Sequence, residues 1–79
     1  MPAMITVNVE VHAPAGMATA QIVVHHATPV GAAWSHLPDG IVRGDPPWGV
    51  HYILNGTRTL PSAWMADGDL LVIDLSEAR

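Results

Sequence analysis

Residues 67–75 read DGDLLVIDL and decide the fold. The Asp-Gly pair at 67–68 is typical of a tight turn, because glycine adopts positive φ freely and an aspartate side chain bonds nearby backbone groups. The run from Leu70 to Leu75 is almost continuously apolar. Such a run predicts a strand in the middle of a sheet, covered on at least part of both faces. We expect this strand to be central.

The preceding residues predict a hairpin. Residues 50–54 read VHYIL and favour a third strand, and residues 57–60 favour a short fourth strand. Between them, Asn55-Gly56 is the strongest short-range hairpin signal, since both positions tolerate positive φ. Residues 61–66 are expected to be irregular or to form one helical turn.

The first half of the chain predicts two strands and a helix. Residues 4–11 alternate between apolar and polar, and residues 21–26 are rich in Ile and Val, so we expect an antiparallel hairpin. The loop between these two strands should be fairly long and contains the turn residues 13–16 (APAG). Thr28 is the expected helix cap and Pro29 the first helical residue. One apolar stripe at helical spacing follows, made of Val30, Ala33, Trp34 and Leu37. Pro38 and Gly40 should end this short helix.

The element order is therefore β-β-α-β-β-β within a single domain, residues 1–79. A right-handed crossover through the helix places the third strand in the same sheet, and the last strand fits beside the first and parallel to it. The predicted class is α+β: a mixed sheet of four to five strands with one short helix packed across one face. This is the β-grasp, or ubiquitin-like, arrangement.

Two segments resemble a known family. Ile53-Leu54-Asn55-Gly56, then Leu60, then residues 66–73 (ADGDLLVI) are similar to the second half of the sulfur carrier proteins of thiamin and molybdopterin synthesis. The resemblance implies a β-grasp fold. Those carriers end in Gly-Gly, whose carboxylate is adenylated and then thiolated, whereas this sequence ends Ser76-Glu77-Ala78-Arg79. We therefore expect no carrier chemistry from the chain as it stands.

Charge and composition exclude several functions. The chain has no lysine, its three arginines (Arg43, Arg58 and Arg79) are scattered, and its net charge is −4. A nucleic-acid partner needs a basic stripe, so we expect no nucleic-acid binding and no attraction to an anionic membrane. No cysteine is present, which excludes disulfides and thiolate metal sites. No apolar run spans a bilayer and no basic segment opens a secretion signal, so a cytoplasmic protein is expected. Arginine without lysine suggests a GC-rich genome, such as that of an actinobacterium or its phage.

Candidate chemical groups are few, and each has a structural explanation. The histidines, His12, His25, His26, His36 and His51, could bind a metal only if three converged. His25 and His26 are adjacent in a strand and should point to opposite faces. Asp67 and Asp69 are expected to serve the turn, Trp34 and Trp64 the core and its edge. No cofactor or catalytic group is predicted.

The uncovered face of the sheet is the better functional candidate. If Leu71, Ile73 and Leu75 face the helix, then Leu70 and Val72 face outward, beside Ile53 and His51 of the third strand, with Thr6 and Asn8 of the first strand completing the face. Trp48 follows two prolines in a loop and could anchor an interface. We therefore predict a non-catalytic module that docks a protein partner, or a second copy of itself, through Ile53, Leu70, Val72, His51 and Trp48. The alternatives are a diverged sulfur-carrier-like protein that works with an adenylating enzyme, and a histidine metal-binding protein.

Overall fold

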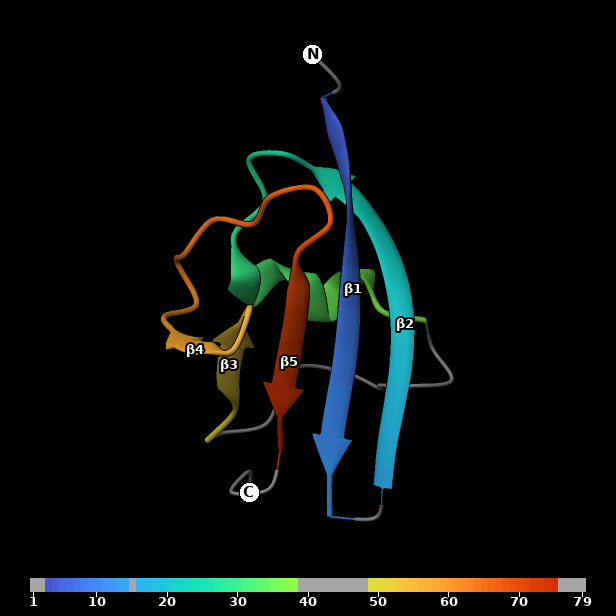
Figure 1. Ribbon diagram of the computed structural model, residues 1–79, viewed down its shortest axis with the longest axis vertical. Helices are drawn as coiled ribbons and strands as arrows, with labels where there is room; N and C mark the ends of the chain where they lie inside the picture. Colours follow the sequence, from blue (N-terminus) through green and yellow to red (C-terminus); the bar gives the residue numbers. More distant parts are fainter. Residues whose placement is uncertain (1–2, 15, 39–48, 76–79) are drawn as a thin grey trace.

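The computed structural model describes residues 3–14, 16–38 and 49–75. They form one mixed sheet of five strands and one short 3₁₀-helix (Figure 1). The elements are β1 (Met4–Ala13), β2 (Gly16–His25), η1 (Val30–His36), β3 (His51–Leu54), β4 (Thr57–Thr59) and β5 (Leu70–Asp74). The predicted α+β class, with a mixed sheet and one short helix, is confirmed.

The sheet has the strand order β2-β1-β5-β3-β4. β5 lies between β1 and β3, pairing parallel with β1 and antiparallel with β3. The apolar run at residues 70–74 thus occupies the middle of the sheet, as its composition predicts. The two hairpins, β1–β2 and β3–β4, lie on either side of β5.

The first hairpin is longer than the sequence suggested. Pairing continues to Ala13 and Gly16, so the expectation of a fairly long loop is wrong. Residues 17–20 read MATA, which lacks the β-branched density that marks the rest of β2. These four residues are paired with residues 9–12 of β1. Pairing with β1 stabilises them as a strand, and their own composition does not predict this pairing.

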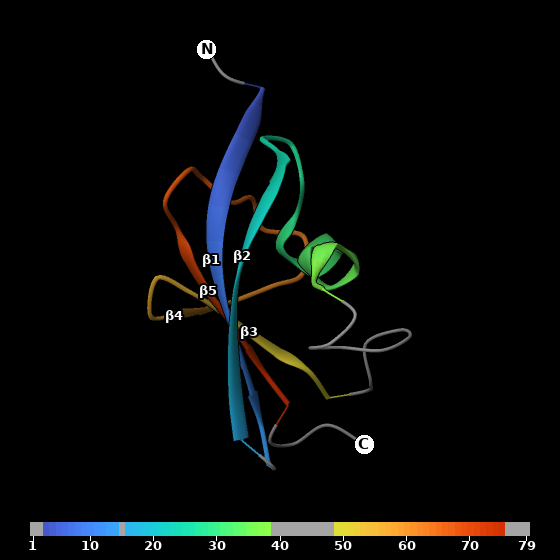
Figure 2. The same cartoon turned by 90° about the vertical axis from the view of Figure 1, so that its right-hand side faces the viewer.

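The helix covers one face of the sheet (Figure 2). Its predicted apolar stripe, Val30, Ala33, Trp34 and Leu37, is buried against the inward side chains of β1, β2 and β5. Leu71, Ile73 and Val7 are among the most deeply buried residues. On the facing strands, the alternation of buried and exposed positions follows the period of two that the sequence predicts.

The start of the helix differs from the prediction. η1 is a 3₁₀-helix, Pro29 occupies the cap position, and no side chain caps it, so the assigned capping role of Thr28 is wrong. The free N–H groups of Val30 and Gly31 instead donate to the carbonyl oxygens of Ala63 and Pro61, both at 2.8 Å. Because the segment between β4 and β5 satisfies these donors, a side-chain cap is unnecessary.

The helix and the β4–β5 connection approach each other closely at Gly31 and Pro61. A Cβ placed on Gly31 would lie 2.9 Å from Pro61 Cβ and 3.1 Å from Pro61 O. A glycine is therefore needed here for the approach of two backbones. The contact joins the helix to the segment leading into β5.

We expect stability to fall at alkaline pH because of Tyr52. This residue is buried on β3, and desolvation raises the pKa of its phenol above the ordinary value of about 10. Below that value the phenol is neutral in both states and stability is unaffected. Above it the unfolded chain loses the proton first, so the free energy of unfolding should fall by up to ~1.4 kcal/mol per pH unit until the folded phenol also ionises.

The measurement is urea denaturation between about pH 9 and pH 11. The chain has one tyrosine and no lysine, so no other side chain ordinarily titrates in this window. Tyr52→Phe is the matched control and should flatten the dependence. An equal decline in the Tyr52→Phe variant would mean that burial of the phenol is not its cause.

Candidate protein-binding face

The outward side of β5 carries the predicted face. Leu70 is 38% exposed and Val72 is half-buried, whereas Leu71 and Ile73, between and after them, have no exposed surface. The inward and outward assignments made from the sequence are therefore confirmed for these residues. A one-residue slip in register would have reversed them.

Neighbouring strands bring the other predicted residues to the same place. Ile53 of β3 pairs with Val72, and His51 pairs with Asp74. On the opposite side, Asn8 of β1 pairs with Leu70. We call Ile53, Leu70 and Val72 the outer patch: three apolar side chains on adjacent central strands, on the face opposite η1.

Polar groups surround the outer patch. Arg58 Nη2 lies 2.6 Å from His51 Nδ1 across the β3–β4 pair, and His12 Nε2 lies 3.0 Å from Glu10 Oε1 on β1. Glu10 itself pairs with Val72. The face is thus an apolar centre between β5 and β3 with hydrogen-bonding and charged side chains around it.

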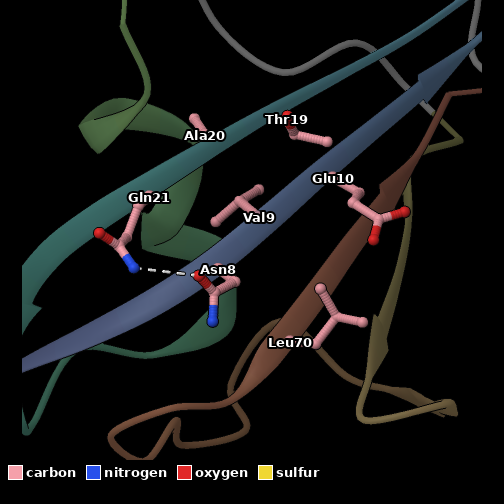
Figure 3. Close-up of a pocket in the computed structure, with 7 residues that line it drawn as sticks. All are labelled: Asn8, Val9, Glu10, Thr19, Ala20, Gln21 and Leu70. Carbon is pink, nitrogen blue, oxygen red and sulfur yellow. Dashed lines mark hydrogen bonds between the residues drawn. The ribbon is translucent and has the colours of Figure 1, made fainter.

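A shallow depression lies beside Leu70 (Figure 3). It has a volume of about 330 Å³ and is lined by Asn8, Val9, Glu10, Thr19, Ala20, Gln21 and Leu70. Gln21 Nε2 donates to Asn8 Oδ1 at 3.2 Å across the β1–β2 pair. The depression is mostly open to solvent and holds one carboxylate, so it can accommodate a protruding side chain of a partner.

Asp67 and Asp69 hold the turn that precedes β5, as predicted. Asp69 accepts hydrogen bonds from the backbone N–H of Ala66 (2.7 Å) and from Nδ2 of Asn55 (2.9 Å), and Asp67 accepts from the backbone N–H of Thr6 (2.8 Å). Asn55, at a φ of 51°, also accepts from the N–H of Leu70 at 3.0 Å. This link between the Asn-Gly and Asp-Gly turns was not predicted. It fixes the start of β5, and hence the position of Leu70.

The histidines are distributed over β1, β2 and the turn after it, η1 and β3. Among the described residues, no group of three or more His, Cys, Asp or Glu side chains is arranged to hold a metal ion. The expectation that His25 and His26 point to opposite faces is wrong: their rings stack with centroids 4.4 Å apart. β2 ends at His25, so the strand alternation does not extend to His26, which lies in the turn that follows.

Of the two described tryptophans, one lies in the core and one at the surface. Trp34 is buried, as predicted, but Trp64 is 64% exposed, so its assignment to the core edge is wrong. Its backbone pairs with Pro29 and holds the residue at the surface of the β4–β5 connection. Trp48 and the C-terminal residues Ser76 to Arg79 lie outside the described residues.

Comparisons with known proteins give no assignment: no family, no curated protein and no solved structure matches the chain. In the part of the chain that the structure describes, no helix has the length and apolar character needed to cross a bilayer.

Proposed function

We propose that this chain is a β-grasp domain that acts as a non-catalytic protein-interaction module and docks its partner through the outer patch. The observation that carries the proposal is the exposure of Leu70 on a central strand, with Val72 and Ile53 half-buried beside it. Central-strand positions that face solvent are ordinarily polar in a sheet with one covered face. Apolar residues there gain free energy when a partner removes them from water.

The β-grasp assignment is supported by the strand order and the place of the helix. β5 is the middle strand and runs parallel to its neighbour β1, and η1 crosses one face. Among the described residues, no helix lies on the opposite face. The fold supplies a rigid base for the outer patch, because β5 is hydrogen-bonded on both sides.

The composition of the face also suits a protein partner. Interfaces have a core of low charge and a polar rim that fixes orientation. Ile53, Leu70 and Val72 supply such a core, and Arg58, Glu10 and Asp74 supply charges of both signs around it. A partner with an apolar centre and a mixed polar rim is complementary to this arrangement.

The hydrogen bonds of the acidic turn favour binding over catalysis. Asp67 and Asp69 are the closest pair of carboxylates in the sequence, and both accept backbone hydrogen bonds that hold the turn. Both carboxylates thus have a structural role in the turn. The proposed module therefore works by contact alone.

The test is affinity purification from the cells that encode the chain, with the native chain and three variants compared as baits. Leu70→Asp and Val72→Asp place a charge in the outer patch, and the matched control Leu60→Asp places one at an exposed leucine of the β4–β5 connection. Proteins recovered with the native chain should be retained by Leu60→Asp and lost with both patch variants. Circular dichroism checks that all three are folded.

Retention of the same partners by folded Leu70→Asp and Val72→Asp chains would contradict the proposal. Loss of the partners with Leu60→Asp alone would place the contact at the β4–β5 connection instead. Either result would reject the outer patch as the docking surface.

A further inference from the structure

A second feature of the sheet is its long outer strand, β2. β2 spans Gly16–His25 and pairs with β1 on one side; no described strand pairs with its other side. The edge strand at the opposite end, β4, has three residues and carries Arg58 at its centre. Short edge strands and charged edge residues are common devices that prevent unwanted strand pairing. β4 has both devices.

β2 has neither device. It contains no Asp, Glu, Lys or Arg and no proline. Its side chains Met17 and Val23 are 62% and 59% exposed. An uncharged edge of this length is a template for the addition of another strand.

The register shows which backbone groups point away from β1. His26 donates to Ala3 O at 2.8 Å, so the even-numbered residues of β2 bond to β1. Consistently, the even-numbered residues Thr6 and Asn8 of β1 bond to the β5 side. The odd-numbered residues of β2 therefore direct their N–H and C=O groups to the free edge. They are Met17, Thr19, Gln21, Val23 and His25, of which His25 gives its C=O to the N–H of Thr28.

We propose that β2 pairs antiparallel with β2 of a second copy of this chain, about a two-fold axis at Gln21. Residues with outward backbone groups must face each other, which restricts the registers to those that join odd with odd residues. Centring the axis on Gln21 pairs the longest run, from Met17 opposite His25 of the second copy to His25 opposite Met17. The two sheets then form one continuous sheet.

Side chains favour a second copy as the occupant of this edge. On the helix-facing side, the register sets Ala20 opposite Ile22 and Ala18 opposite Val24 of the second copy, so small residues meet large ones. On the outer side, Thr19 meets Val23, both compatible with strand pairing. Because β2 carries no formally charged side chain, two identical strands meet without the like-charge repulsion that most surface strands would impose.

This inference goes beyond the proposed function and is independent of it. β1 separates β2 from β5, so the outer patch is not part of the β2 edge. Dimerisation through β2 leaves Leu70 and Val72 available to another protein. Variants of the two sites should therefore have separate effects.

Single-cysteine cross-linking tests the register directly, since the native chain has no cysteine. In the proposed dimer, residue 21 lies opposite itself at a Cα separation of about 5.5 Å, within reach of a disulfide. Residue 19 lies about 14 Å from its own copy along the strand, since four residues separate them. Gln21→Cys should form a disulfide dimer under mild oxidation on the order of tenfold faster than Thr19→Cys or Val23→Cys alone.

A mixture of Thr19→Cys and Val23→Cys should cross-link as heterodimers at a rate close to that of Gln21→Cys. Sedimentation equilibrium of the native chain and of Leu70→Asp should give twice the 8.4 kDa chain mass. A native chain that stays at the mass of one copy across the concentration range would overturn the inference. So would equal cross-linking rates for the three cysteine variants, or a dimer abolished by Leu70→Asp in a folded chain.

Discussion

Leu71→Ala should lower the free energy of unfolding by about 2–5 kcal/mol, whereas Leu70→Ala should change it by less than about 1 kcal/mol. The two leucines are neighbours in β5, but Leu71 has no exposed surface and Leu70 faces solvent. Truncating Leu71 opens a cavity between the sheet and η1. A domain of 79 residues is stable by only about 4–12 kcal/mol, so much of that margin would be lost.

Urea denaturation followed by circular dichroism measures both variants, and an unchanged slope would confirm that they unfold in the same way. The comparison is matched, because both substitutions remove the same atoms from adjacent residues of one strand. Equal losses at the two positions, or a larger loss at Leu70, would mean that β5 is shifted by one residue. The outer patch would then not exist.

The register of β5 could be predicted because two independent patterns agree on it. The turn at Asp67-Gly68 fixes where the strand begins, and the alternating strand over residues 4–11 shows which side of the sheet needs a core. The helical stripe of Val30, Ala33 and Trp34 then identifies what covers that side. The turn residues and the strand periodicity therefore predict the same inward and outward faces for β5. For this reason Leu70 and Val72 could be placed on the outward face from the sequence.

The missed features depend on contacts between segments that are distant in sequence. The first N–H groups of η1, on Val30 and Gly31, donate to carbonyl oxygens of the β4–β5 connection, and the Asn55–Asp69 bond joins two turns fourteen positions apart. Neither contact leaves a mark in local composition. The free edge of β2 follows from the strand order, in which β1 is the one described strand that pairs with β2.

Trp34 and Trp64 provide the second large expected effect. Trp34→Ala should destabilise the domain by about 3–5 kcal/mol, because the indole is 6% exposed and fills the space between η1 and the sheet. Trp64→Ala should cost no more than about 0.5 kcal/mol, because its side chain lies largely in solvent and its pairing with Pro29 involves only the backbone. Urea denaturation at neutral pH gives both values.

Trp34→Phe is the control for shape, since it keeps an aromatic ring in the core and should recover a large part of the loss. Trp64→Phe should be indistinguishable from the native chain. A loss at Trp64→Ala as large as that at Trp34→Ala would return Trp64 to the core edge, where its sequence position first suggested it. The helix would then be held by a cluster that extends beyond η1, and the β4–β5 connection would contribute to the core through its side chains as well as through the carbonyl groups of Pro61 and Ala63.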